Sequence, residues 1–307
     1  MSTGWVAGAI RARALASRCV GAEGARDLAR SGDLDEALRR LAATPYHARL
    51  RGTAGLSQAQ RAVSQTLLWH LRVLAGWLPR DGVRMLRPLA AGFETANVAG
   101  RFRTERGSAP PAAYELGALA TASRALARAA APGELRAALA ASSWGDPGDE
   151  TAGSVLTTMR LTAAQRTATA VPAARRWAAG RAALVTARER YVHRRRLGET
   201  ARRAAAAVLG ARALEASGYE DFRRALPSAA RWAVTDVDTP TDLWRAETHW
   251  WHTLGTDGRG MMHTARHDAT AVVGAVAVLS ADCWAVRAAL AVAERGGARE
   301  GVPGALV

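Results

Sequence analysis

Apolar residues recur along much of the chain at the spacing of one helix face. Between residues 57 and 79, five of them follow at steps of three and four: Val63, Leu67, Leu71, Leu74 and Leu78. This period forms one stripe along an amphipathic helix, and Pro79 is expected to end that helix. Alternating apolar and polar positions of useful length are missing, so no strand is expected. The pattern therefore predicts an all-α fold.

Polar residues at the ends of these stripes predict where helices begin. Three starts are expected, and they carry the pairs Ser57 with Gln60, Asp33 with Glu36, and Thr239-Pro240 with Asp242. The first two have the spacing of a capping box, and the third places Pro at the first helical position. Turn-rich connectors are expected at 104–112, 144–153, 235–241 and 255–260, and a loose tail at 296–307.

Two sequence markers return three times in the same order. The phrase Leu-x-x-Ala-Leu in "LDEALRRLAATPY" has counterparts in "LRAALAASSW" and "FRRALPSAARW", which end the shared core at Leu38, Leu139 and Leu226. A helical acidic marker recurs at Glu94, Glu189 and Asp282. The period is roughly 95 residues, longer than that of common solenoid repeats. We expect three similar small helical domains, at residues 1–106, 107–198 and 199–307; a chance match in an Ala-rich chain is the alternative.

The acidic marker is most complete in "FETANVAGRFR". On a helix, Glu94, Asn97 and Arg101 share one face, so Glu and Arg can pair while Asn binds a neighbouring backbone group. The other copies contribute the following candidates: Glu189, Asp282 and Arg287. We interpret these residues as groups that position structure or a partner, with no catalytic role.

Charge and cysteine content narrow the setting. The 307 residues carry a net charge of +15, and all 42 basic residues are Arg. An anionic partner would explain the excess, whereas a coding bias toward Arg explains the missing Lys. Two cysteines make no disulfide framework, which fits a reducing compartment. The apolar run 270–281 is too short to span a bilayer, so the sequence predicts a soluble chain, which could still bind to a membrane protein.

Catalytic signatures are weak. No phosphate loop, dinucleotide fingerprint or Cys-x-x-Cys pair occurs, and no cofactor is expected. Four histidines, with helical spacing within each pair, suggest a metal-dependent enzyme as one alternative: His249, His252, His263 and His267. Ordinary packed or surface histidines explain them better, and no metal is expected. The basic run 193–203 suggests an Arg-rich nucleic-acid-binding protein as a second alternative, although arginines spread over the whole chain.

The sequence resembles a known family, the C-type central-stalk subunits of the V-type and A-type rotary ATPases (d-type in eukaryotes). The resemblance rests on the N-terminal stretch from "WVAGAIRARAL" to "AATPY", with Arg11 and Arg13, and on Glu94, Asn97 and Arg101 in mid-chain. It continues near the C-terminus in this set: Gly274, Asp282, Ala285 and Arg287. Leu279 and Ala285 stand where family members carry Lys and Asn.

The resemblance implies a fold and a function. Members of this family are all-helical funnels built from three similar domains around a pseudo-threefold axis. They do no chemistry; they cap the cytoplasmic side of the membrane rotor ring and hold the foot of the central shaft. Expected partners are therefore the proteolipid rotor ring, the central-stalk subunits of the soluble sector and anionic lipid headgroups. The expected location is the cytoplasmic face of the cell membrane, as a peripheral protein.

Overall fold

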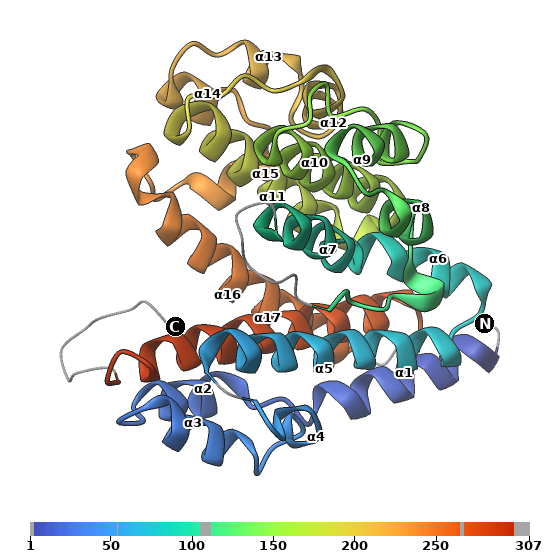
Figure 1. Ribbon diagram of the computed structural model, residues 1–307, viewed down its shortest axis with the longest axis vertical. Helices are drawn as coiled ribbons and strands as arrows, with labels where there is room; N and C mark the ends of the chain where they lie inside the picture. Colours follow the sequence, from blue (N-terminus) through green and yellow to red (C-terminus); the bar gives the residue numbers. More distant parts are fainter. Residues whose placement is uncertain (1–2, 54, 105–111, 265–266, 298–307) are drawn as a thin grey trace. The chain divides into compact units, whose positions relative to one another are not determined.

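The computed structural model of the chain describes residues 3–53, 55–104, 112–264 and 267–297 (Figure 1). The structure is 76% helix, and no strand occurs in the described ranges. This confirms the all-α prediction. The chain forms two compact units, Met1–Gly82 with Trp251–Val307 (unit 1) and Val83–Trp250 (unit 2). The arrangement of three domains in a funnel stays a prediction. Its first expected boundary, after residue 106, lies outside the described residues, as do most of the connector 104–112 and the tail 296–307.

Three long helices form the centre of unit 1, with short helices packed on them. The long helices are α1 (Thr3–Ala16), α5 (Leu56–Trp77) and α17 (Ala269–Ala293), and each contacts the other two. The short ones are α2 (Gly21–Ala29) and α3 (Leu34–Leu41) on α17, and α4 (His47–Leu50) on α5. Segments from both ends of the sequence therefore build one core.

The helix α17 is long and apolar enough to cross a membrane by length and composition. It runs to Ala293, well beyond the apolar segment 270–281 on which the sequence argument rested. In the structure, 67% of its most apolar window is buried inside the protein. Packed between α1, α2 and α5 and carrying the buried Asp282, α17 is the core helix of unit 1.

One close backbone approach in unit 1 depends on glycine. A Cβ atom added to Gly274 in α17 would lie 2.6 Å from the carbonyl oxygen of Gly258, and one added to Gly258 would lie 2.7 Å from that of Gly274. Gly258 belongs to α16 (Leu243–Met262), the helix along which the chain passes from unit 2 into unit 1. Two facing glycines thus allow α16 and α17 to touch through their backbones.

Unit 2 is built around α10 (Ala152–Ala170). This helix contacts α7 (Ala91–Thr104), α11 (Arg175–Ala187) and α12 (Glu199–Leu209). Shorter helices complete the unit: α8 (Ser123–Arg128), α9 (Pro132–Ala140), α13 (Ala211–Glu215), α14 (Tyr219–Ala225) and α15 (Ser228–Arg231). A π-helix (Arg188–Val192) extends α11, and 3-10 turns lie at Gly117–Leu119, Pro172–Ala174, Trp232–Val234 and Pro240–Asp242. The chain enters unit 2 along α6 (Arg80–Leu89).

The expected helix ends are partly right. The connector expected at 255–260 is wrong, because α16 continues through it to Met262. Asp33 caps α3 by accepting a hydrogen bond from the Glu36 backbone N–H at 2.7 Å, as predicted. Pro79 follows directly after the last turn of α5, which also agrees. The Ser57 cap is wrong, because α5 already begins at Leu56, after Gly55 with φ +82°. A glycine with a positive φ angle precedes this helix, and no side chain caps its N-terminus.

Candidate functional site

The acidic marker of α7 holds the start of another helix. Glu94 is 1% exposed, and its Oε1 accepts hydrogen bonds from the Ala122 backbone N–H (2.9 Å) and the Ser123 hydroxyl (2.5 Å) at the N-terminus of α8. Its Oε2 accepts one from the indole N–H of Trp144 (2.9 Å). We call Glu94, Ala122, Ser123 and Trp144 the unit 2 clamp.

Unit 1 contains the same arrangement. Asp282 of α17 is 7% exposed and accepts a hydrogen bond from the Gly21 backbone N–H (2.7 Å) at the N-terminus of α2. Its other oxygen accepts one from the hydroxyl of Tyr46 (2.8 Å). We call Asp282, Gly21 and Tyr46 the unit 1 clamp. In both clamps a buried carboxylate from a long helix lies at the positive end of a short helix and binds an aromatic donor.

The turn that delivers the aromatic donor is also shared. The Thr44 hydroxyl donates to the Leu41 carbonyl (2.6 Å) and accepts from the Tyr46 N–H (3.3 Å). In unit 2 the Ser142 hydroxyl donates to the Leu139 carbonyl (2.8 Å) and accepts from the Trp144 N–H (3.2 Å). The two clamps therefore have the same local construction, down to a hydroxyl that closes the turn.

This match corrects the register of the recurring phrase. The structure equates Leu41 with Leu139, since each lies five residues before its aromatic donor and is at most 1% exposed. Leu38, the residue matched to Leu139 in the sequence, is only half-buried. Leu226 is fully buried as expected. The pairs Ala37-Leu38 and Ala138-Leu139 look alike in the sequence, so the sequence alignment of the two helices was wrong by one helical turn.

Burial governs the chemistry of the unit 1 clamp. Burial raises the pKa of Asp282, although hydrogen bonds from four neighbours act to lower it: Gly21, Tyr46, Val20 and Cys19. Burial and the charge of Asp282 raise the pKa of Tyr46 well above its usual value and also that of the Cys19 thiol. Burial raises the pKa of Cys283 to about 12. Protonated thiols are poor nucleophiles, so the geometry favours a structural junction over a reactive centre.

Asn97 and Arg101 also bind backbone groups in unit 2. Asn97 donates to the Tyr114 carbonyl (2.9 Å) and accepts from the Tyr114 N–H (2.6 Å), as expected. The Arg101 guanidinium donates to the Leu126 carbonyl in α8. The expected pairing of Glu94 with Arg101 is wrong, because each side chain binds a different part of α8 or its neighbours. Together the three residues attach the segment 114–126 to α7.

Glu189 and Arg287 lie in different surroundings. Glu189 is buried in the π-helix and forms an ion pair with Arg195 (3.4 Å), with no hydrogen bond to a helix start among the described residues. Its neighbour Arg190 donates to the Ala216 carbonyl after α13 (2.6 Å). Arg287 is exposed on α17, where its carbonyl accepts from Gln60 (2.9 Å). The structure thus brings two of the three predicted acids, but not Glu189, into a clamp.

The histidine segment does not converge on one point in the described residues. His249 and His252 are exposed on α16, and His263 is exposed just after it. The ring of His249 lies edge-on to Trp232, with centroids 5.9 Å apart. Within the described ranges, no three His, Cys, Asp or Glu side chains lie close enough to hold a metal ion. The geometry gives no support to the metal-dependent enzyme.

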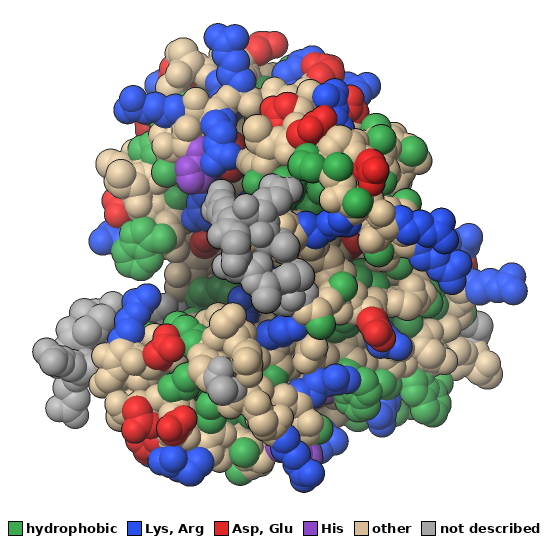
Figure 2. All heavy atoms as spheres, viewed as in Figure 1, with side chains coloured by type: hydrophobic (Ala, Val, Ile, Leu, Met, Phe, Trp, Pro, Cys, Tyr) green, Lys and Arg blue, Asp and Glu red, His purple; other side chains and the backbone are tan. Residues whose placement is uncertain are grey.

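An exposed apolar face of unit 1 was not anticipated from the sequence. Ile10 on α1 is 55% exposed, and Trp69 and Trp77 on α5 are 44% and 53% exposed. Figure 2 shows hydrophobic side chains grouped at the surface where α1 and α5 lie. Arg72, on the same helix as the two indoles, is also exposed. We call Ile10, Trp69 and Trp77 the α1–α5 face.

Comparison with known proteins adds no further assignment. No model of a known protein family matches this chain, and no curated protein sequence is significantly similar to it.

Proposed function

We propose that this chain is a non-catalytic central-stalk subunit of a rotary V-type or A-type ATPase, which caps the membrane rotor ring and couples it to the central shaft. The observation that carries the proposal is the repetition of one clamp in two places. The family resemblance implies a protein built by repetition of one helical plan. Each of the two clamps has a buried acid, the start of a short helix, a turn closed by a hydroxyl and an aromatic donor.

The clamps suit a protein that transmits torque. Each ties a long helix to a short helix and to a following loop through hydrogen bonds to a buried carboxylate. Such bonds are stronger than neutral ones and are costly to break in a dry interior. Alanine-rich helices add close packing with little loss of side-chain entropy. A stiff helical body fits this function better than a reactive pocket does.

The α1–α5 face is where we place the rotor ring. Large exposed aromatic side chains on paired helices are typical of interaction surfaces. Indoles and arginines together fit the cytoplasmic end of a membrane-embedded ring, because Trp favours the membrane–water interface and Arg favours anionic headgroups. Of the partners expected from the resemblance, the ring is therefore the occupant we assign to this face.

The experiment is capture of the complex from detergent-solubilised membranes by affinity-tagged full chain. Ring and stalk subunits in the eluate are quantified by mass spectrometry for the native chain and for the double variant Trp69→Glu, Trp77→Glu. The matched control is Trp244→Glu, since Trp244 is 51% exposed but lies on α16 rather than on the α1–α5 face. Circular dichroism checks that all three proteins are folded.

The proposal predicts that the native chain and the control capture both ring and stalk, whereas the double variant loses the ring. Loss of the ring from the double variant should also uncouple ion transport from ATP hydrolysis. Equal capture by the double variant would move the ring contact elsewhere. Failure of the native chain to capture either partner, with tight binding of duplex DNA at physiological salt, would replace the proposal by the nucleic-acid alternative.

A further inference from the structure

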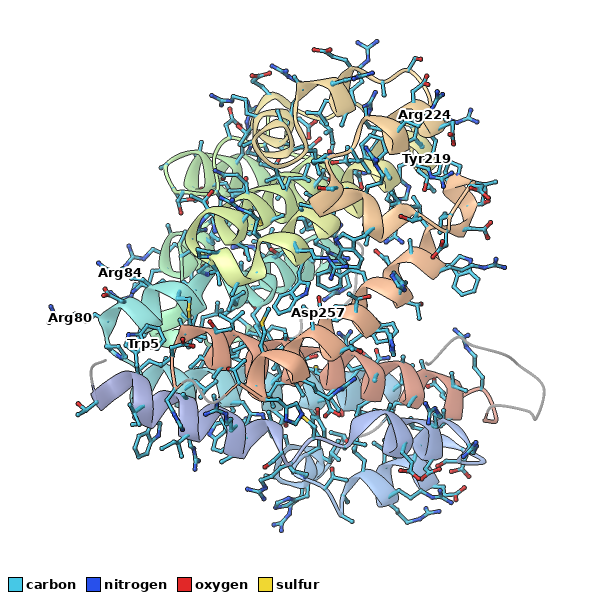
Figure 3. All side chains as sticks on the ribbon, turned by 180° about the vertical axis from the view of Figure 1, so that it is seen from behind. Trp5, Arg80, Arg84, Tyr219, Arg224 and Asp257 are labelled. Carbon is cyan, nitrogen blue, oxygen red and sulfur yellow. The ribbon has the colours of Figure 1, made fainter. Side chains whose placement is uncertain are left out.

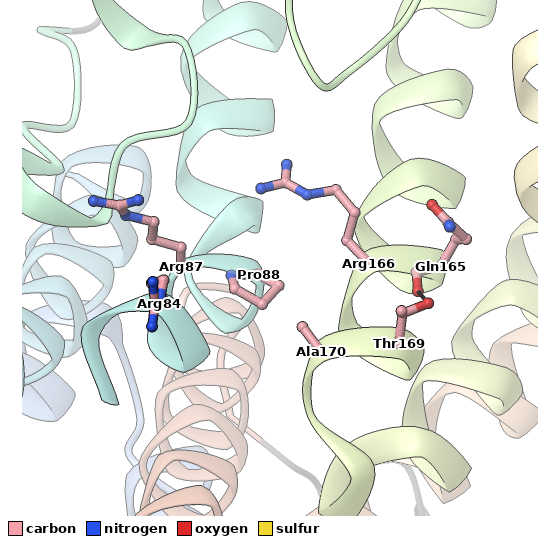
Figure 4. Close-up of a pocket in the computed structure, with 7 residues that line it drawn as sticks. All are labelled: Arg84, Arg87, Pro88, Gln165, Arg166, Thr169 and Ala170. Atoms are coloured by element: carbon pink, nitrogen blue, oxygen red, sulfur yellow. Dashed lines mark hydrogen bonds between the residues drawn. The ribbon is translucent and has the colours of Figure 1, made fainter. Parts of the chain in front are cut away.

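A pocket lined by three arginines lies in unit 2. It has a volume of about 300 Å³ and is formed by the C-terminal part of α6 and the C-terminal half of α10. Arg84 and Arg87 come from α6, and Arg166 comes from α10. Figure 3 places Arg84 on α6, and Figure 4 shows the side chain of Arg166 extending from α10 toward Arg87.

The pocket has an excess of positive charge and of hydrogen-bond donors. None of its seven lining residues is acidic, and Gln165 and Thr169 add polar groups on the α10 side. The Nη1 atom of Arg166 is buried without a hydrogen-bond partner in the described structure. An unsatisfied buried donor on a charged group is costly, so an acceptor that reached this guanidinium from the pocket would be favoured.

The groups around Arg166 hold it in place without neutralising it. Its Nη2 donates to the Thr121 hydroxyl at 3.3 Å, and its guanidinium carbon lies 5.3 Å from the centroid of the Trp144 ring. Glu94 lies near enough to favour the charged form, but both of its oxygens are already used in the unit 2 clamp. Burial, together with Arg87, lowers the pKa of Arg166. The cation is therefore positioned by the clamp and remains short of an anion.

We propose that this pocket binds a phosphate-type anion, either as a free phosphate or as the phosphate group of a lipid. Arginine presents a planar set of donors that matches phosphate oxygens, and three arginines around one pocket can bind several of them at once. A volume of about 300 Å³ is at the lower end for small-molecule sites, which suits a single anionic group. The inference does not depend on the proposed rotary function.

Two binding measurements on the full chain test this proposal. Inorganic phosphate is titrated by isothermal calorimetry at low ionic strength. Flotation then compares vesicles of pure phosphatidylcholine with vesicles that also contain phosphatidylglycerol. The test variants are Arg87→Gln and the double variant Arg84→Gln, Arg87→Gln, which leave the contact of Arg166 with Trp144 intact. The matched control is Arg128→Gln, because Arg128 is exposed on α8 in the same unit and does not line the pocket.

Loss of bidentate contacts should weaken binding about tenfold for the single variant and further for the double variant, with the control unchanged. Binding of inorganic phosphate with this pattern identifies a free anion as ligand. Binding only to anionic vesicles, with the same pattern, identifies a lipid headgroup. Binding to neither probe overturns the proposal, and so does equal weakening by Arg128→Gln, which would indicate a general effect of surface charge.

Discussion

Replacing Glu94 by Gln removes one acceptor and the charge from the unit 2 clamp while keeping the side-chain shape. A carboxylate offers two acceptor oxygens to its three donors, but an amide offers one oxygen and an NH2 group. If the amide oxygen takes the place of Oε1, the amide NH2 group faces the indole N–H of Trp144, which is also a donor. If the oxygen takes the place of Oε2 instead, Ala122 and Ser123 lose their acceptor. At least one charge-assisted hydrogen bond is lost and one buried donor is unsatisfied. We expect a loss of about 2–5 kcal/mol in the free energy of unfolding.

The assay is urea denaturation of the full chain followed by circular dichroism, with hydrogen exchange and mass spectrometry to locate the change. Protection should fall in α7, α8 and α9. The control is Glu115→Gln, which makes the same charge change at an exposed residue and should shift stability by about 0.5 kcal/mol or less. Equal effects of the two substitutions would refute the reasoning.

A double-mutant cycle isolates the bond between the acid and its aromatic donor. Trp144→Phe removes the indole N–H and leaves Oε2 of Glu94 without that donor. If this bond operates, the effects of Glu94→Gln and Trp144→Phe should fail to add by about 1–3 kcal/mol. Additive effects would show that the two side chains contribute independently, contrary to the clamp.

The remaining predictions concern unit 1 and the histidines. Gly274→Ala should lower the free energy of unfolding by about 1–3 kcal/mol, because its Cβ would meet the Gly258 carbonyl, whereas Gly76→Ala, with open space around it, should be neutral or stabilising in the same urea titration. Tyr46→Phe should cost about 1.5–3 kcal/mol, since it removes a buried donor to the charged acid of the unit 1 clamp; a cost below about 0.5 kcal/mol, the effect of a neutral surface change, would contradict that role. Burial and two nearby arginines lower the pKa of His70 to about 4, so its neutral form stabilises the fold above pH 6.5 and that contribution is lost as pH falls toward 4. Between pH 7 and 4.5, the free energy of unfolding of the variant His70→Gln should therefore fall by about 2–3 kcal/mol less than that of the native chain. Parallel profiles of unfolding free energy against pH would exclude this role. Elemental analysis should find no stoichiometric zinc or iron, and one bound equivalent would restore the enzyme alternative.

Local signals in the sequence were enough for the fold class and for several helix ends. The stripe that ends at Leu78, the stop at Pro79 and the cap by Asp33 all depend on residues within a few positions of one another. The start of α5 escaped this reasoning, because Ser57 and Gln60 have capping-box spacing inside a helix that had already begun at Leu56. Spacing alone does not say which of two adjacent starts the backbone takes.

The candidate site was predictable only in part. The acids, the recurring phrase and the aromatic residue after it are all visible in the sequence, and Asn97 binds a backbone group as expected. What the sequence does not contain is the contact between them, because Asp282 and Tyr46 come from opposite ends of the chain. A search for a hydroxyl two residues before an aromatic, as in Thr44-Pro-Tyr46 and Ser142-Ser-Trp144, would have paired the clamps in the correct register.

The arginine pocket depends wholly on tertiary structure. In a chain that carries 42 basic residues, nothing in the sequence distinguishes Arg84, Arg87 and Arg166 from the others. They become a group because α6 and α10 place them around one pocket, and because the stacking of Arg166 on Trp144 links the pocket to the unit 2 clamp.

The most direct test of the central claim is the composition of the complex that the native chain forms in its own membranes. Tagged full chain is purified from detergent-solubilised membranes, and its partners are identified and counted by mass spectrometry. The account predicts that the proteolipid ring and the central-stalk proteins co-purify with one copy of this chain per complex, and that added salt weakens the association without unfolding the protein. Recovery of the chain without ring or stalk proteins, from membranes in which that ATPase is intact, would contradict it.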